Sequence, residues 1–246
     1  EDLFLCIEKP TLDSSQELMR KCDLVIATGG QGLVKAAYSS GTPAYGVGTG
    51  NVVSVVAETA DVAAVAEKII GSNINDLATG CSTENSVLVQ KSVHAAFLKA
   101  MQAGGSKLCD AEEKAKLQRV LWVDGHLNGE LICRPAAVIA RAAGISVPDD
   151  CTVILVEETG YGPEYPFSGE KLSVVLTVYS YDTFDEAVEL VNNIQAYQGA
   201  GHSCGIHSAD EDHIMQFALR TRTARVMINS PQNKANAGSF KNGMPF

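Results

Sequence analysis

The sequence predicts an α/β protein with a largely parallel sheet. Along its 246 residues, short runs of apolar and β-branched residues alternate with longer stretches of helix formers. This alternation is typical of strand–helix–strand units, in which successive strands run parallel. The runs "CTVILVEE" (residues 151–158) and "LSVVLTVYSY" (residues 172–181) are continuous enough to lie in the centre of such a sheet.

Glycines and capping residues place the individual elements. Residues 23–30 are an apolar run ending in glycines, which predicts a strand, and the helix formers of residues 31–41 end at a glycine stop. Residues 59–73 predict an amphipathic helix whose N-cap is Thr59 or a residue before it. Further strands are expected at residues 43–48, 51–59, 84–90 and 224–230, and further helices at residues 92–105, 110–122, 135–144 and 183–196. The polar residues 231–246 are expected to form a loop.

Composition and charge argue against several classes of function. The formal net charge is -10 and no basic cluster offsets it, which argues against nucleic acid as a partner. The longest apolar runs have the length of strands, so we expect no membrane span. The 7 cysteines show neither C-x-x-C nor metal-ligand spacing, so we expect reduced thiols, no metal site and a cytoplasmic location. The chain starts without Met and without a signal peptide, and we expect it to be a piece of a longer protein.

The stretch "ATGGQGLVK" (residues 27–35) has features of a ligand-binding turn. Gly29 and Gly30 end a strand before a helix, which leaves backbone N–H groups free for an anionic or nicotinamide-bearing ligand. A plain strand-to-helix turn is the other interpretation. The stretch is not the G-x-G-x-x-G fingerprint, so a simple nucleotide-binding module is not supported.

The stretch "DLATGCSTENSVLV" (residues 76–89) sets Cys81 among small, turn-forming residues. Gly80 leaves room for a substrate, and Ser82 and Thr83 offer hydrogen bonds, as a catalytic thiol requires. Taken locally, Cys81 is either a nucleophile or an ordinary thiol. The 5 histidines are far apart in the sequence and supply no obvious Cys–His pair, which argues against a cysteine protease.

Two further residues have both a functional and an ordinary interpretation. Glu170 precedes the predicted strand at residues 172–181, and its local sequence favours a solvated turn carboxylate. His202, in "GAGHSCG", either lines an acyl or coenzyme A pocket or is a loop histidine with its hydrogen bonds satisfied.

Several of these segments, taken in order, resemble the aldehyde dehydrogenase superfamily, in particular its CoA-acylating branch. Residues 27–61 are similar to the nicotinamide end of the branch's nucleotide-binding domain, and residues 76–90 to the segment around its catalytic cysteine. Residues 169–193 are similar to the E-x-x-x-P-V-L segment, whose Glu hydrogen-bonds the nicotinamide ribose. The resemblance covers nearly the whole chain, with residues 201–208 and 225–240 falling where later segments of the branch lie.

The resemblance implies the fold, the site and the ligands. It implies part of a Rossmann-type nucleotide-binding domain in residues 1–70, a catalytic domain in residues 71–228, and a tail in residues 229–246. It also implies NAD or NADP as cofactor, a small aldehyde and coenzyme A as substrates, and a homo-oligomer. The implied catalytic residue is Cys81, and the implied cofactor contacts are Thr28, Gly29, Gly30, Gly48 and Glu170.

The implied reaction has two halves. Cys81 attacks the aldehyde, a hydride passes to NAD(P)+, and the resulting thioester is transferred to coenzyme A. Hydrolytic members of the superfamily carry a Glu that activates water, whereas the corresponding position here is Val47, which favours the acylating branch. The Asn side chain that the superfamily uses to stabilise the oxyanion would lie upstream of residue 1.

Three departures from the branch pattern concern the geometry of the pocket rather than the reaction class. Leu77 follows Asp76, Gly80 precedes Cys81, and Val174 stands where Pro is usual.

Within the branch, "CSTENS" and "NAGSFKNGMPF" favour sulfoacetaldehyde as the substrate, with acetaldehyde and propionaldehyde as alternatives. An anionic aldehyde would need a cation near Cys81, and the candidates by chemistry alone are Arg134, Lys234 and Lys241, each also readable as a solvated surface residue. Two other interpretations stay open: a hydrolytic aldehyde dehydrogenase and a non-catalytic scaffold subunit.

Overall fold

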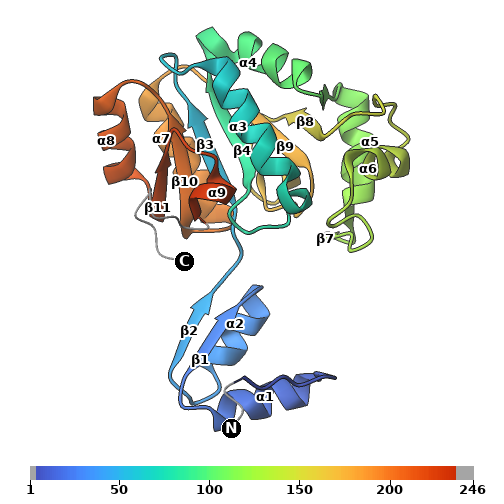
Figure 1. Ribbon diagram of the computed structural model, residues 1–246, viewed down its shortest axis with the longest axis vertical. Coiled ribbons are helices and arrows are strands. Elements are labelled where there is room, and N and C mark those ends of the chain that lie inside the picture. The colour runs from blue at the N-terminus through green and yellow to red at the C-terminus, as the bar shows by residue number, and fades with distance from the viewer. Residues whose placement is uncertain (1–3, 237–246) are drawn as a thin grey trace. The chain divides into compact units, whose positions relative to one another are not determined.

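The computed structural model describes residues 4–236, and the chain divides into two compact units between Thr49 and Gly50 (Figure 1). The sequence led us to expect a boundary near residue 70. The structure places β3 (Val52–Val56) and α3 (Val62–Ile74) in the second unit, because β3 pairs with strands that follow it in the chain.

The first unit contains a small parallel sheet and two helices. Strand β1 (Val25–Thr28) pairs in parallel with β2 (Ala44–Val47), and α2 (Gln31–Tyr38) connects them. The preceding helix, α1 (Leu12–Lys21), was not predicted; it begins at a capping box in which Thr11 and Ser14 hydrogen-bond each other's backbone N–H groups. The buried core of this unit is small and consists of Val25, Ala27 and Ala37, with Met19 and Ala44 packed against it.

The second unit is built on a seven-stranded sheet in which every pair of neighbouring strands is parallel, in the order β11-β10-β3-β4-β9-β8-β5 (Figure 1). This arrangement confirms the predicted α/β class with a parallel sheet. The strands besides β3 are β4 (Glu84–Gln90), β5 (Ser106–Leu108), β8 (Val153–Glu157), β9 (Val175–Tyr181), β10 (Gly201–His207) and β11 (Thr223–Ile228). A separate short hairpin joins β6 (Trp122–Val123) and β7 (His126–Leu127).

Helices cover both faces of this sheet, which is why its central strands are apolar throughout. Successive residues of β4 face opposite sides: Val87 and Val89 pack in the core with α3 and α4, whereas Leu88 packs in the core with α7 and α8. The helices besides α3 are α4 (Lys91–Ala103), α5 (Ala111–Leu121), α6 (Ala136–Ala143), α7 (Phe184–Tyr197), α8 (Glu211–Arg220) and α9 (Gln232–Asn236), and the 3-10 turns are η1 (Asn75–Ala78) and η2 (Pro166–Ser168).

The N-cap of α3 differs from the prediction. Asp61, not Thr59, caps the helix by accepting a hydrogen bond from the N–H of Ala64 at 3.1 Å. The Thr59 hydroxyl is used elsewhere: it pairs with the hydroxyl of Ser208 at 3.0 Å and accepts from the N–H of Ala209 at 3.0 Å. Thr59 therefore links the end of β3 to the end of β10.

The predicted loop at residues 231–246 is wrong in part. Residues 232–236 form the short helix α9, since the N–H of Ala235 donates to the carbonyl of Pro231 at 3.0 Å. Residues 237–246, including Lys241, lie outside the described residues. Within residues 4–236, no helix is both long and apolar enough to cross a bilayer.

A buried carboxyl group, Glu84 at the start of β4, joins the sheet to α9. The side chain is 2 % exposed, and its Oε1 accepts a hydrogen bond from the N–H of Gln232 at 3.1 Å. Burial raises the pKa of Glu84 from 4.5 to about 7, against the opposing effects of the Ser72 hydroxyl and the Gln232 N–H. The carboxyl group is therefore largely protonated in the folded protein below neutral pH.

This shift predicts a pH-dependent stability for Glu84→Gln. Because the folded-state pKa is raised, the protonated Glu84 carboxyl group contributes its full stability below pH 4.5. This contribution is lost as the pH rises through about 7. Between pH 5 and 8, the natural protein should lose about 2 to 3 kcal/mol of unfolding free energy relative to Glu84→Gln. Urea unfolding at both pH values measures this, with the exposed Glu67→Gln on the neighbouring α3 as control. If the unfolding free energy changed equally between pH 5 and 8 in Glu84→Gln and Glu67→Gln, the prediction would be contradicted.

Candidate functional site

The candidate site residues of the second unit gather at one edge of its sheet. Cys81 precedes β4, Glu170 precedes β9, and Gly50 precedes β3, while His202 is the second residue of β10. Because neighbouring strands of this sheet are parallel, their amino ends lie at the same edge. The sheet therefore brings Cys81, Glu170 and His202 to one end of the second unit.

A strained turn delivers Cys81 to this edge. Asp76, Leu77 and Ala78 have φ of 51°, 50° and 59°, the left-handed region that residues with a Cβ rarely adopt. Leu77 and Ala78 pack against the core that contains α5 and α6, which holds the turn in place. The N–H of Thr83 then donates to the carbonyl of Gly80 at 2.9 Å and closes a tight turn around Cys81. The thiol thus stands on a turn with little freedom.

The close approach of Gly50 to Cys81 requires a glycine. A Cβ on Gly50 would lie 2.1 Å from the carbonyl oxygen of Cys81, far closer than atoms can approach. Gly199, with a φ of 84°, approaches Asn51 in the same way, since its Cβ would lie 2.3 Å from the Asn51 nitrogen. The segments before β3, β4 and β10 therefore pack backbone against backbone at the site.

The Cys81 thiol has opposite charges near it. Cys81 is an exposed residue, but surrounding atoms crowd its Sγ, and this burial is the main cause that raises the thiol pKa. The Glu170 carboxylate raises the pKa further, while the backbone N–H of Cys81 and the Arg225 guanidinium lower it. Burial and the Glu170 carboxylate therefore disfavour the thiolate, and the Cys81 N–H and Arg225 favour it.

Glu170 is buried and is not a solvated turn carboxylate. The residue is 8 % exposed, its own N–H donates to Oε1 of Gln198 at 2.7 Å, and the N–H of Gly50 hydrogen-bonds its carboxylate. Burial raises the pKa of Glu170 to about 7, against the effects of the Gly50 N–H and the neighbouring Lys171 ammonium. A carboxylate accepts several hydrogen bonds, so this one keeps acceptor capacity for a ligand hydroxyl.

Arg225 is the functional candidate that sequence reasoning missed. It lies on β11 opposite Ser203 of β10, and its charge acts on both Cys81 and His202. His202 pairs through Nδ1 with the Ser203 hydroxyl at 2.9 Å, and burial and then Arg225 lower its pKa. Arg225 could be recognised only from its position opposite Ser203, and the sequence does not reveal that position until β10 and β11 are known to pair.

The other cations and polar candidates are placed differently. The Arg134 side chain donates to the carbonyl of Glu130 at 3.1 Å, and Lys234 lies exposed on α9; neither acts on the Cys81 thiol. Beside Cys81, Ser82 is half-buried and Thr83 is buried. Among residues 4–236, no group of three or more His, Cys, Asp or Glu residues could hold a metal ion.

The remaining predicted cofactor contacts belong to the first unit. Thr28 ends β1, the N–H of Gly29 donates to the Val47 carbonyl at 3.0 Å, and Gly30 is the N-cap of α2. No side chain caps this helix; among its first N–H groups, that of Leu33 donates to the carbonyl of Gly30 at 3.0 Å. A glycine-ended strand followed by an uncapped helix suits an anionic group. Gly48, directly after β2, is exposed.

Comparison with known proteins identifies the family. The model of the aldehyde dehydrogenase family matches residues 167–244, the part of the chain that contains Glu170, His202 and Arg225. The chain is 43% identical over 99% of its length to a sulfoacetaldehyde dehydrogenase of an Acholeplasma species. It is 45% identical over 95% of its length to a sulfoacetaldehyde dehydrogenase (acylating) of Cupriavidus necator. The chain belongs to the aldehyde dehydrogenase family.

The structural comparison agrees with this family. An acetylating aldehyde dehydrogenase of Geobacillus thermoglucosidasius superposes with a TM-score of 0.92 at 38% identity, over 97% of this chain and 53% of that one. The chain likewise spans 51% and 48% of the two relatives named above, that is, about half their length. The aldehyde-dehydrogenase-like fold expected from the sequence is therefore confirmed, and the coverage fits the expectation of a piece of a longer protein.

The electrostatics of the site predict how Glu170→Gln changes the thiol of Cys81. Because the Glu170 carboxylate raises the pKa of the thiol, its removal should lower that pKa. Alkylation of Cys81 by iodoacetamide at pH 7.5 should then be roughly two- to fivefold faster. Peptide mass spectrometry separates Cys81 from the other 6 thiols. The matched control is Glu164→Gln, an exposed carboxylate of the same loop, and an unchanged rate in Glu170→Gln would refute the assignment.

Proposed function

We propose that the complete protein is an NAD(P)-dependent, CoA-acylating aldehyde dehydrogenase whose preferred substrate is sulfoacetaldehyde. One observation carries the proposal: Cys81 stands exposed on a rigid turn at the sheet edge where the buried carboxyl of Glu170 also lies. Support comes from acylating relatives, which match this region at up to 45% identity.

In the proposed reaction, the Cys81 thiolate attacks the aldehyde carbon and forms a carbon–sulfur bond. Bound NAD(P)+ would supply the hydride acceptor, and loss of the hydride would leave the carbon as a thioester of Cys81. The thiolate of coenzyme A then attacks the thioester, a new carbon–sulfur bond forms, and the bond to Cys81 breaks. Cys81 is thereby restored as a thiolate. The negative oxygen formed in both halves needs nearby donors, and Arg225 supplies positive charge beside Cys81.

By analogy with the family, each unit has its own proposed cofactor contacts. In the second unit, Glu170 would accept a hydrogen bond from a ribose hydroxyl of the cofactor. In the first unit, the turn at Thr28, Gly29 and Gly30, together with Gly48, would contact an anionic or nicotinamide-bearing group. An engineered glycolyl-CoA reductase that is 27% identical to this chain binds NADP+. Either NAD or NADP agrees with the residues at hand.

Hydrolysis of the thioester is the second candidate reaction. It needs a carboxylate that activates water, and Val47 cannot serve. Glu170 is the carboxyl group whose charge acts on Cys81 among the described residues, and its pKa of about 7 suits a general base. The product distinguishes the two reactions, because hydrolysis gives a free acid and transfer to coenzyme A gives an acyl-CoA.

The location and assembly of the protein are part of the proposal. All seven cysteines are free thiols, which supports the cytoplasm as the location. A homo-oligomer is proposed from the likeness to the family alone. A non-catalytic scaffold subunit would retain the fold without turnover, and the activity assay distinguishes it.

The first test measures the reaction of the complete protein. NAD(P)H formation from sulfoacetaldehyde should require coenzyme A, and Cys81→Ala should lower it by about 10⁴-fold or more because the nucleophile is gone. Cys133→Ala, at another exposed thiol, is the matched control and should retain activity. Equal turnover without coenzyme A, with acid as product, would establish hydrolysis instead. No turnover with any aldehyde would favour the scaffold.

The preference for an anionic aldehyde predicts a specific effect of Arg225→Gln. Loss of the guanidinium near Cys81 should raise KM for sulfoacetaldehyde roughly tenfold, and should raise KM for uncharged acetaldehyde much less. Steady-state kinetics with both aldehydes measure the ratio. Arg222→Gln, at an exposed arginine three residues earlier, controls for net charge. An equal loss with both aldehydes would show that Arg225 does not select the substrate's charge.

A further inference from the structure

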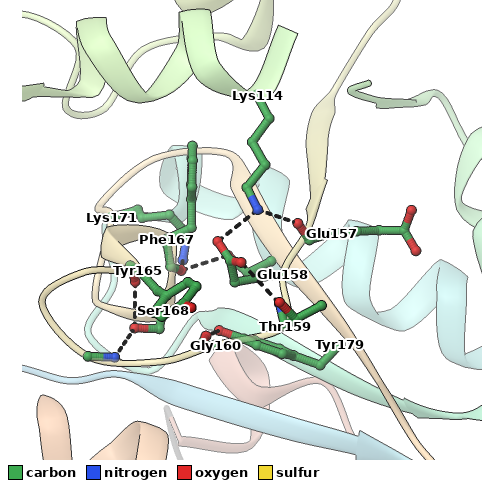
Figure 2. Close-up of polar contacts among 12 residues, drawn as sticks. Lys114, Glu157, Glu158, Thr159, Gly160, Tyr165, Phe167, Ser168, Lys171 and Tyr179 are labelled. Carbon is green, nitrogen blue, oxygen red and sulfur yellow. Dashed lines mark hydrogen bonds and ion pairs between the residues drawn. The ribbon is translucent and has the colours of Figure 1, made fainter. Parts of the chain in front are cut away.

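A buried lysine ties the loop that carries Glu170 to the segment that carries Cys81. The side chain of Lys171 is 0 % exposed, and its Nζ donates to the carbonyls of Phe167 at 2.8 Å, Asn85 at 2.9 Å and Gly169 at 3.0 Å. Figure 2 shows Lys171 beside Phe167. Three carbonyl acceptors match the three N–H bonds of an ammonium group, so the geometry favours charged Lys171.

Two hydrogen bonds join the two segments, and Lys171 is the donor in both. The Asn85 side chain accepts from the backbone N–H of Lys171 at 2.9 Å, and the Asn85 carbonyl accepts from the Lys171 ammonium. Asn85 lies in β4, which directly follows the turn of Cys81, and is 7 % exposed. The pair therefore links the start of β4 to the residue next to Glu170 through two hydrogen bonds that solvent does not reach.

The loop from Tyr165 to Lys171 has few other attachments to β4. The Phe167 carbonyl also accepts from the Thr177 hydroxyl at 2.7 Å, and Asn51 donates to the Ser168 carbonyl at 2.8 Å. These bonds hold the loop to β9 and to the segment before β3. Within residues 4–236, the hydrogen bonds that join this loop to β4, the strand that follows Cys81, are those from Lys171 to Asn85.

We propose that Lys171 and Asn85 are positioning residues that fix the Glu170 carboxylate relative to the Cys81 thiol. This inference rests on the proposed function for its kinetic consequence, because the cofactor and the aldehyde must meet at a set distance for hydride transfer. Neither residue touches the reacting atoms. Lys171 is not among the groups whose charge acts on the Cys81 thiol, so it reaches the thiol through Glu170.

The main test reads the position of Glu170 through the thiol. Alkylation of Cys81 is followed against pH in the natural protein and in Lys171→Met, Asn85→Ala and Glu170→Gln. Asn85→Ala leaves the lysine charge in place, so it reports position rather than charge. We expect both positioning variants to lower the apparent thiol pKa and to speed alkylation at pH 7.5 by roughly two- to fivefold, as Glu170→Gln does. Adding either change to Glu170→Gln should give no further acceleration.

A matched control comes from a second lysine, on helix α5, that contacts the same loop. Lys114 donates to the Glu157 carbonyl at 2.6 Å, pairs with the Glu158 carboxylate at 2.8 Å and lies 5.8 Å from the centre of the Phe167 ring (Figure 2). It contacts the loop without contacting Asn85 or acting on Cys81. Lys114→Met should leave alkylation within about 1.5-fold of the natural rate.

Kinetics of the complete protein provide the second measurement. Lys171→Met and Asn85→Ala should raise KM for NAD(P) roughly tenfold, and Lys171→Arg, which keeps the charge, should restore part of the loss.

Additive effects with Glu170→Gln, or alkylation unchanged in both variants, would overturn the inference. If Lys171→Met does not fold, as shown by its melting curve, Asn85→Ala carries the test. Inactivity of the natural protein would refute the proposed function alone, since the alkylation cycle needs no turnover.

Discussion

The places of Cys81 and Glu170 in the candidate site depend on the pairing of β4 with β3 on one side and β9 on the other. The two ladders are parallel, so they align the amino ends of the three strands, and the residues from Val87 to Val89 are completely buried. A strand paired on both sides cannot slide by one residue without turning its side chains to the wrong faces. The turn before β4 therefore has a fixed starting point, and the thiol on it acquires a fixed place.

The site is not a single ion pair, because Glu170 and Arg225 both act on the thiol of Cys81, and Lys171 acts on Glu170. Glu170 and Lys171 are neighbours in the chain, and burial raises the pKa of the carboxyl while it lowers the pKa of the amine. Each charge partially offsets the effect of burial on the other: the Lys171 ammonium lowers the pKa of Glu170, and the Glu170 carboxylate raises the pKa of Lys171. Arg225 approaches from β11, on the opposite side of β3 from β4 and β9. A charged ligand that entered the site would add its own effect to the pKa of the Cys81 thiol.

Much of the fold could be predicted, and the misses have physical reasons. Strands β8 and β9 and helix α7 carry continuous apolar runs and a Thr183–Glu186 capping box, which local sequence reveals. Strand β10, "GHSCGIH", has little β propensity and becomes a strand because it is buried between β3 and β11. Helix α1 buries none of its residues, and only Leu12, Leu18 and Met19 of its 10 residues are apolar. At the site, Cys81 could be named from its small neighbours, whereas the burial of Glu170 and the approach of Arg225 arise from contacts between distant segments.

The left-handed turn at Asp76, Leu77 and Ala78 has a consequence for protein engineering. Residues with a Cβ pay roughly 1 kcal/mol or more each to adopt this conformation, and glycine or asparagine would adopt it more easily. A search for thermostable variants would therefore select substitutions here, at the segment that aims the nucleophile. Glycine would also enlarge the conformational freedom of the unfolded chain and remove the Leu77 contact with the core, which offsets the relief of strain. Asparagine at Asp76, which is exposed, is the change that relieves strain while leaving those core contacts intact.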